Sequence, residues 1–231
     1  MIDVQVSCPA GQYGSTSLLG SDTCTGPCSP GHYCLAGSTS PTQNICPPAG
    51  RFGSQPALGS PECSGQCDAG YYCPDDGRSM NATRYPCGGS HVYCPHGSGA
   101  PIPVSPGFYS VGGGSDSLDV MVGAEEDHHE EVWLNGARRS HQVQCTPGTY
   151  CVMGVRRYCP EGQYGLDYGQ QINTCSGQCQ PGYYCPKGST SPEQVACPAG
   201  RYGSVEGLGN SQCTNACAKG HYCPMNSTNA R

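Results

Sequence analysis

Apolar residues occur along this chain as isolated positions and pairs that recur in successive segments. A Cys-Pro pair is followed by Gly-x-aromatic-Gly, with the aromatics at Tyr13, Phe52, Tyr164 and Tyr202. A Leu-Gly pair follows at Leu19, Leu58 and Leu208, and then comes Gly-x-Tyr-Cys at Tyr33, Tyr72, Tyr184 and Tyr222. Gly and Pro interrupt the chain too often for helices. The pattern predicts strands of three or four residues joined by turns.

The same segments share one spacing of cysteines, C-x15/16-C-x3-C-x5-C. The first cysteines of neighbouring units lie 38 residues apart, from Cys8 to Cys46 and from Cys159 to Cys197. A fixed period of this length marks an array of small modules, each resting on its neighbours. The sequence predicts repeats at residues 1–45, 46–86, 159–196 and 197–231, with an atypical module at 87–158.

The atypical module has its own cysteine spacing. Cys87 and Cys94 are followed by no cysteine until Cys145. The interval contains an apolar stretch from Val104 to Tyr109, an acidic run at residues 125–131, and an Asn135-Gly136 pair next to Trp133. Asn-Gly between short runs is a strong hairpin signal, so we expect strands on both sides of it.

The composition indicates that disulfide bonds, and not a large apolar core, hold the fold together. The chain has 231 residues with 35% hydrophobic, 35 Gly and 21 Pro, too few apolar side chains for a large core. With 20 Cys, it is typical of disulfide scaffolds in oxidising compartments. A loop of about 15 residues closed by a disulfide gains roughly 3 kcal/mol. Zinc is the competing interpretation, but structural zinc sites favour C-x2-C or C-x4-C pairs. The predicted fold class is therefore small and disulfide-rich: an elongated tandem array of short β-hairpin modules with little helix.

Candidate chemistry is sparse. No nucleophile motif or paired carboxylates stand out, so we expect no enzyme, no catalytic residue and no cofactor. The acidic run contains His128 and His129, but adjacent side chains on an extended chain point to opposite faces, so we expect a solvated loop and no metal site. Asn81 and Asn226 each begin an Asn-x-Thr sequon, Asn81-Ala82-Thr83 and Asn226-Ser227-Thr228. Both are predicted glycosylation sites in a secretory protein. Ser-Pro pairs are read as turns, with O-glycosylation as the alternative.

The net charge and the hydropathy of the chain restrict the classes of partner that we expect it to bind. A net charge of -6 with 11 Lys plus Arg offers no basic groove for nucleic acid. No apolar run approaches the roughly 20 residues that span a bilayer, so we expect no membrane insertion. Met1–Ser7 is too short and polar for a secretion signal, and we expect a processed form or a part of something longer.

The motif Cys-Pro-x-Gly-x-Tyr-Gly-Ser, followed by Cys-Ser-Gly-Gln-Cys-x-x-Gly-Tyr-Tyr-Cys-Pro, resembles the ephrin-receptor-like cysteine-rich repeats. These repeats occur in large surface proteins of protists, algae and oomycetes, and look like relatives of epidermal-growth-factor-like and tumour-necrosis-factor-receptor modules. The resemblance covers nearly the whole chain, including Tyr85-Pro86-Cys87 and Gly148-Thr149-Tyr150-Cys151. Relative to the family pattern, the acidic run at residues 125–131 looks like an insertion. It implies an extracellular, elongated, cysteine-stapled architecture without catalytic residues.

For the cysteines we predict pairing between sequence neighbours, since every unit then closes on itself and the long loop resembles the first loop of tumour-necrosis-factor-receptor modules. The interleaved alternative joins first to third and second to fourth cysteines, and it stays open. The predicted bonds are Cys8–Cys24, Cys28–Cys34, Cys46–Cys63, Cys67–Cys73, Cys87–Cys94, Cys145–Cys151, Cys159–Cys175, Cys179–Cys185, Cys197–Cys213 and Cys217–Cys223.

Together these features predict a non-catalytic extracellular or cell-surface protein, a disulfide-stapled rod that self-associates into a layer or filament. The expected contact residues are the Val104–Tyr109 stretch and the Trp133 hairpin. The alternative is a receptor or adhesin ectodomain that captures a protein or glycan. The repeated tyrosines are interpreted as packing over disulfides, with a ligand-binding aromatic stripe as the alternative.

Overall fold

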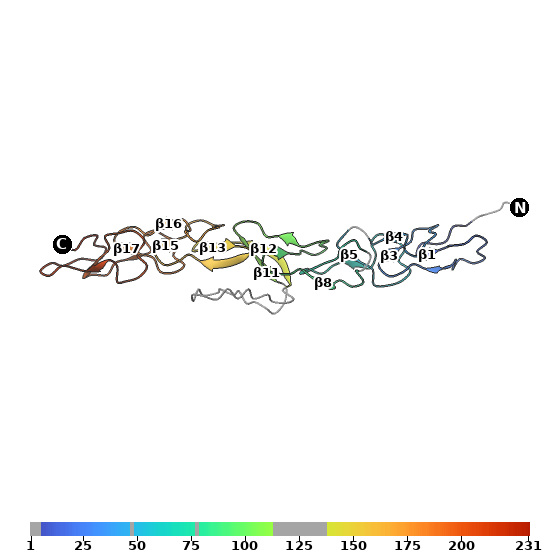
Figure 1. Cartoon of the computed structure of the whole chain (residues 1–231), viewed down its shortest axis with the longest axis horizontal. Coiled ribbons are helices and arrows are strands. Elements are labelled where there is room, and N and C mark those ends of the chain that lie inside the picture. The colour runs from blue at the N-terminus through green and yellow to red at the C-terminus, as the bar shows by residue number, and fades with distance from the viewer. Residues whose placement is uncertain (1–5, 47–48, 77–78, 113–137) are drawn as a thin grey trace. The chain divides into compact units, whose positions relative to one another are not determined.

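The computed structural model describes residues 6–46, 49–76, 79–112 and 138–231 (Figure 1). Within these ranges the chain forms short β-strands and no helix, and ten disulfides join them. The predicted class, a small disulfide-rich array of short β-hairpins, is confirmed. The acidic run, Trp133 and the Asn135-Gly136 pair lie outside the described residues.

Most strands are only two residues long, shorter than the three or four expected. Those before residue 104 are β1 (Gln12–Tyr13), β2 (Gly26–Pro27), β3 (His32–Tyr33), β4 (Asn44–Ile45), β5 (Arg51–Phe52), β6 (Gly65–Gln66), β7 (Tyr71–Tyr72), β8 (Tyr85–Pro86), β9 (Val92–Tyr93) and β10 (Ile102–Pro103). Those after residue 158 are β15 (Gln163–Tyr164), β16 (Gly177–Gln178), β17 (Tyr183–Tyr184), β18 (Val195–Ala196), β19 (Arg201–Tyr202) and β20 (Asn215–Ala216).

Four longer strands lie between these two sets. They are β11 (Phe108–Gly112), β12 (Arg139–Gln144), β13 (Thr149–Val152) and β14 (Val155–Tyr158). Each odd-numbered strand pairs with the even-numbered strand that follows it, so that β1 pairs with β2 and β19 pairs with β20. The β13–β14 hairpin is antiparallel, with Thr149 opposite Tyr158 and Val152 opposite Val155. The topology is thus a series of local pairs rather than one sheet.

All ten disulfides join sequence neighbours, and the interleaved pairing is not formed. Two loop sizes result, since the joined cysteines are 16 or 17 positions apart in one class and 6 or 7 in the other. We call the segment that runs from the first cysteine of one bond to the first cysteine of the next bond a disulfide hairpin. Each hairpin is named by its own bond.

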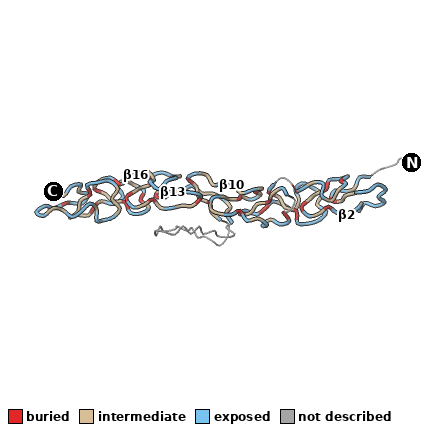
Figure 2. The backbone as a smooth tube through the Cα atoms, in the orientation of Figure 1, coloured by how far each residue is buried: buried red, intermediate tan, exposed pale blue. Residues whose placement is uncertain are grey.

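The buried hydrophobic side chains among the described residues are all cysteines. Figure 2 shows these buried positions recurring as short stretches along the backbone instead of forming one central core. The tyrosines Tyr33, Tyr72 and Tyr184, each directly before a buried cysteine, are half-buried, and their packing over disulfides stays a prediction. In the Cys-Pro-x-Gly-x-aromatic-Gly motif, the aromatic residue lies opposite a glycine of the paired strand, as Tyr164 lies opposite Gly177.

The second cysteine of each four-cysteine unit has an unusual backbone conformation. Cys24, Cys63, Cys175 and Cys213 have φ angles of 51°, 51°, 49° and 51°. Non-glycine residues seldom adopt this left-handed region, and it is retained only where surrounding structure imposes it. Here the disulfide and the following hydrogen bond, such as Ser176 N–H to Tyr164 C=O at 2.8 Å, hold the turn.

The described residues form two compact units. The first contains residues 6–103, 111–112 and 138–141 apart from the gaps noted above, and the second contains Val104–Ser110 and residues 142–231. The division falls inside the span 87–158 that the sequence suggested as one atypical module. The boundaries of the repeats themselves remain predictions.

Candidate functional site: the contact between disulfide hairpins

The most regular polar feature of the described residues is a set of main-chain hydrogen bonds between successive disulfide hairpins within each compact unit. We call this set the step contact. Between the Cys179–Cys185 and Cys197–Cys213 hairpins, its four bonds are Gly182 N–H to Gly203 C=O (2.8 Å), Cys185 N–H to Leu208 C=O (2.8 Å), Gly207 N–H to Cys179 C=O (2.9 Å) and Cys197 N–H to Gly182 C=O (2.8 Å). The β17–β18 pair lies in the same contact, with Tyr184 opposite Val195.

The first unit repeats this contact at equivalent positions. Between the Cys28–Cys34 and Cys46–Cys63 hairpins, the bonds are Gly31 N–H to Gly53 C=O (2.9 Å), Cys34 N–H to Leu58 C=O (2.9 Å), Ala57 N–H to Cys28 C=O (3.0 Å) and Cys46 N–H to Gly31 C=O (2.9 Å). Because every bond uses backbone groups, the contact tolerates different side chains. This explains why His32, before Tyr33, and Tyr183, before the equivalent Tyr184, can differ without a change in the hydrogen bonds of the contact.

Two kinds of residue make the step contact possible. The first is a turn residue whose left-handed backbone aims its N–H at the preceding hairpin, as in Ala57 (φ 63°) and Gly207 (φ 75°). The second is the glycine after the aromatic residue. A Cβ placed on Gly53 would lie 2.8 Å from the Cys46 sulfur and 2.9 Å from the Gly31 nitrogen, so no larger residue fits without movement.

A buried hydroxyl closes the turn in several hairpins. Ser98 and Ser189 donate their Oγ–H to the carbonyls of Pro95 (2.7 Å) and Pro186 (2.6 Å). The carbonyl of Ser189 then accepts the step-contact bond from Gly165 N–H at 2.9 Å. A buried serine without such a partner would be costly, so the Gly-Ser pair in the sequence marks this turn.

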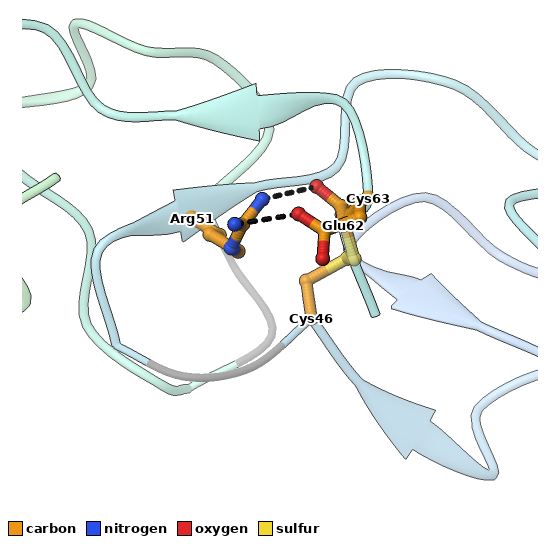
Figure 3. Close-up of polar contacts among 4 residues, drawn as sticks. All are labelled: Cys46, Arg51, Glu62 and Cys63. Atoms are coloured by element: carbon orange, nitrogen blue, oxygen red, sulfur yellow. Dashed lines mark hydrogen bonds and ion pairs between the residues drawn. A yellow bond between two sulfur atoms is a disulfide. The ribbon is translucent and has the colours of Figure 1, made fainter. Parts of the chain in front are cut away.

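A side-chain clasp crosses the long loop in two repeats. Arg51 donates to the main-chain carbonyl of Glu62 at 3.0 Å and forms an ion pair with its carboxylate at 2.5 Å, beside the Cys46–Cys63 bond (Figure 3). Arg201 donates in the same way to the carbonyl of Gln212 at 2.9 Å. The sequence interpretation did not single out these arginines, although both occupy the same place before the aromatic residue.

Several tyrosines hold basic side chains over their rings. Arg156 lies 4.8 Å from the Tyr109 ring centroid, Arg138 lies 5.5 Å from that of Tyr71, and Lys187 lies 5.7 Å from that of Tyr158. Such cation–π contacts stabilise by about 0.5–1 kcal/mol at exposed positions. These contacts involve Tyr71, Tyr109 and Tyr158 and not the tyrosines of the Gly-x-Tyr-Cys motifs. Desolvation by partial burial lowers the pKa of Arg139, but an arginine remains protonated at neutral pH.

The Val104–Tyr109 stretch, which we expected to mediate self-association, is engaged within the second unit. Ser105 N–H donates to the Gln142 side-chain oxygen at 2.8 Å, and the Gln142 amide donates to Ser105 Oγ at 3.1 Å. Tyr109 forms a parallel bridge with Gly154. The stretch therefore contributes to folding of this unit. The other expected contact, the Trp133 hairpin, lies outside the described residues.

The two sequon asparagines differ in their surroundings. Both are exposed. The Asn81 side-chain oxygen accepts from Thr83 N–H at 3.2 Å, whereas the Asn226 amide nitrogen donates to the Tyr183 hydroxyl at 3.0 Å. Asn226 N–H also makes a step-contact bond to Cys197 C=O at 2.9 Å. The nitrogen that would carry a glycan is thus hydrogen-bonded at Asn226.

The described residues contain no cluster of three or more His, Cys, Asp or Glu side chains placed to hold a metal. They also contain no helix long and apolar enough to cross a bilayer. No protein-family model matches the chain, and no curated protein is significantly similar to it.

Proposed function

We propose that this protein is a non-catalytic extracellular structural protein, a disulfide-stapled rod whose copies associate into a surface layer or filament. The observation that carries the proposal is the step contact. It joins successive hairpins through backbone groups that any hairpin of the same kind provides. An array built in this way can be lengthened by adding units, with each interface resembling the last.

The proposed location follows from the cysteine chemistry. Ten disulfides hold buried sulfur in place of an apolar core, and such bonds persist in oxidising compartments and are rare in reducing ones. The resemblance to ephrin-receptor-like surface repeats supports the same location and is itself part of the proposal. Secretion would expose the Asn81 and Asn226 sequons to glycosylation.

We expect glycan occupancy to be higher at Asn81 than at Asn226. The bond from the Asn226 amide nitrogen to Tyr183 holds this nitrogen against a neighbouring side chain, which restricts the approach of a transferase and the space for a glycan, whereas the Asn81 turn uses only the side-chain oxygen. Mass spectrometry of glycopeptides from secreted protein measures both sites. The control is Tyr183→Phe, which removes the acceptor and is expected to raise occupancy at Asn226. Higher occupancy at Asn226 than at Asn81 in the unaltered chain would contradict this expectation.

Self-association is the direct test of the structural role. Light scattering of the native, oxidised protein should show a mean mass that rises with concentration from micromolar to millimolar. A monomer across that whole range would overturn the proposal. The alternative, a ligand-binding ectodomain, would then lead, since a monomeric array is what a receptor or adhesin requires.

A further inference from the structure

The disulfides of the four-cysteine units differ in burial according to the loop that they close. We call a bond between cysteines 16 or 17 positions apart a long-loop bond, and a bond between cysteines 6 or 7 positions apart a short-loop bond. Three short-loop bonds have 0% exposure at both cysteines: Cys28–Cys34, Cys67–Cys73 and Cys179–Cys185. In the long-loop bonds the second cysteine is half-buried in every unit, at Cys24, Cys63, Cys175 and Cys213. Cys63 and Cys175 have further hairpins on both sides, so this exposure belongs to the repeat itself.

Backbone carbonyl oxygens lie against the second sulfur of the short-loop bonds. The Ser40 oxygen lies 3.4 Å from the Cys34 sulfur, and the Ser191 oxygen lies 3.3 Å from the Cys185 sulfur. The four contacts of this kind among the described residues all involve short-loop bonds. A thiolate that approaches such a sulfur meets the partial negative charge of the oxygen and is repelled. The second sulfur of a long-loop bond lacks this cover.

The second cysteine of each long loop also has the left-handed backbone described above, with φ between 49° and 51°. None of the short-loop cysteines of the described residues has a positive φ. Because the disulfide is one of the constraints that retain this conformation, opening a long-loop bond lets its second cysteine return to the ordinary region of φ. An accessible bond with a constrained backbone is the kind of disulfide that exchanges readily with thiols.

The long-loop bonds differ from one another in the charge beside them. Arg201 donates to Gln212 C=O at 2.9 Å, so its guanidinium is held at the peptide bond that leads into Cys213. No carboxylate of the described residues forms an ion pair with Arg201. A positive charge beside a sulfur favours the approach of a thiolate. Cys213 therefore combines an accessible position, a left-handed backbone and an uncompensated cation.

The other long loops lack this combination. Arg51 reaches the residue before Cys63 in the same way, but the Glu62 carboxylate compensates its charge (Figure 3). The remaining two units have Gln12 and Gln163 at the place of the arginine. The attraction for an anionic thiol is thus greatest at Cys213.

We propose that the Cys197–Cys213 disulfide is a site of exchange with an anionic low-molecular-weight thiol of the glutathione class. The thiolate attacks the Cys213 sulfur, and a new bond forms between these two sulfurs. The bond from Cys213 to Cys197 breaks, and its electron pair leaves with the Cys197 sulfur, which takes up the proton that the attacking thiol released. The thiol is thereby oxidised to a mixed disulfide and Cys197 is reduced, so no further oxidant is needed.

The geometry selects Cys213 as the attacked sulfur and Cys197 as the leaving group. Cys197 has 0% exposure, and a Cβ placed on Gly203 would lie 2.9 Å from its sulfur. The glycine backbone therefore covers this side of the bond. Arg201 is held at the Cys213 side, where it attracts both the thiolate and the carboxylates of glutathione. This site goes beyond the proposed structural role and does not depend on self-association.

The test exposes the full oxidised chain to glutathione for short times and then blocks free thiols with N-ethylmaleimide. Mass spectrometry of peptides locates the glutathione adducts and the blocked thiols. We expect the adduct first on Cys213 and the blocked thiol first on Cys197, with reaction at the short-loop Cys179–Cys185 bond roughly tenfold slower. The control is the chain unfolded in denaturant, in which the two bonds should react at similar rates.

A matched pair of substitutions tests the charge. Arg201→Gln gives this unit the residue that Gln163 supplies in the unit beginning at Cys159. It is expected to slow the reaction at Cys213 roughly two- to fivefold, to about the rate at Cys175. The reciprocal Gln163→Arg is expected to speed the reaction at Cys175 by a similar factor. Raised salt should reduce both effects, since exposed charges are screened.

The outcomes separate this inference from the proposed function. Adducts that form first on Cys213, and whose rate follows both substitutions, support it. Adducts on Cys197 in place of Cys213, equal rates at the Cys179–Cys185 bond of the folded chain, or an unchanged rate in Arg201→Gln overturn it. A rate at Cys213 that rises with urea as steeply as the short-loop rate also overturns it, because exchange then requires unfolding. Light scattering decides the structural role independently of these results.

Discussion

The Cys159–Cys175 hairpin and the Val104–Ser110 segment begin with the same pattern, but only the first is closed by a disulfide. Val104 stands where Cys159 stands, three residues before the glycine of the motif. Gly165 has no room for a Cβ, which would lie 2.8 Å from the Cys159 sulfur, whereas its counterpart Ser110 is a buried serine. Removing the sulfur leaves space that a side chain fills.

The strands are also longer in the segment that no disulfide closes. β15 and β16 beside the disulfide have two residues each, whereas β11 has five and β12 has six. A covalent bond restricts the unfolded chain, so that few backbone hydrogen bonds are then needed to hold the hairpin. Without the bond, a longer ladder performs this task. The comparison teaches that a longer strand pair accompanies the loss of the disulfide in this segment, although the β13–β14 hairpin has both a disulfide and four-residue strands.

Full reduction should have the largest effect. We expect both regions to unfold, because isolated two-stranded hairpins are marginal in water and the described core consists of disulfide sulfur. Circular dichroism and limited proteolysis of reduced, alkylated protein measure the loss, with alkylated but unreduced protein as the control. Unchanged spectra and protease resistance after complete reduction would show that disulfides are dispensable.

Removing one disulfide should distinguish the two kinds of hairpin. Cys159→Ser with Cys175→Ser is expected to lower the free energy of unfolding by about 3 kcal/mol, and Cys145→Ser with Cys151→Ser by about 2 kcal/mol. The second loop is shorter, and its β13 pairs over four residues with β14. Denaturant unfolding under oxidising conditions provides the measurement. An equal or reversed order would argue against strand length as a substitute for the bond.

A single methyl group should test the close packing around sulfur. Gly165→Ala is expected to destabilise the protein by about 1–3 kcal/mol, because the new Cβ meets the Cys159 sulfur and the Gly148 backbone. Gly20→Ala is the control, since a Cβ there meets nothing within 4 Å. Both are measured by chemical denaturation. If the two variants have equal stability, the packing explanation for glycine at this position fails.

The Arg51 clasp should have the smallest effect. Arg51→Ala is expected to lower the free energy of unfolding by about 0–1 kcal/mol, as for other partly exposed ion pairs. Glu62→Gln removes the ion pair but keeps the main-chain acceptor, so it separates the two contributions. Thermal unfolding at low and high salt tests this pair. A loss with Glu62→Gln that persists at high salt would be inconsistent with a screened surface interaction.

Much of the fold could be predicted from local sequence. The spacing of cysteines and the Gly-x-Tyr-Cys motifs lie within single units, so they indicated disulfide hairpins, the absence of helix and the class of protein. The buried hydrophobic side chains of the described residues are cysteines, whereas Tyr184 is half-exposed, and the expected packing of tyrosine over disulfides stays a prediction. The Trp133 hairpin and the acidic run stay predictions.

The site was harder to predict. Ala57 and Gly207 differ in residue type, yet both have the left-handed conformation that aims an N–H at the preceding hairpin. No residue pattern marks a position whose role lies in its backbone. Likewise, no local pattern indicated that Ser105, in the Val104–Tyr109 stretch, is hydrogen-bonded by Gln142, 37 residues further along the chain.

By itself, the sequence determined the period, the dependence on disulfides and the local hairpins, because these follow from spacing and composition within about 40 residues. Only the tertiary structure decided which of the two cysteine pairings forms and which backbone groups each hairpin offers to the next. The reason is physical. Such contacts join residues from different hairpins through main-chain atoms, which every residue carries and no side-chain pattern therefore records.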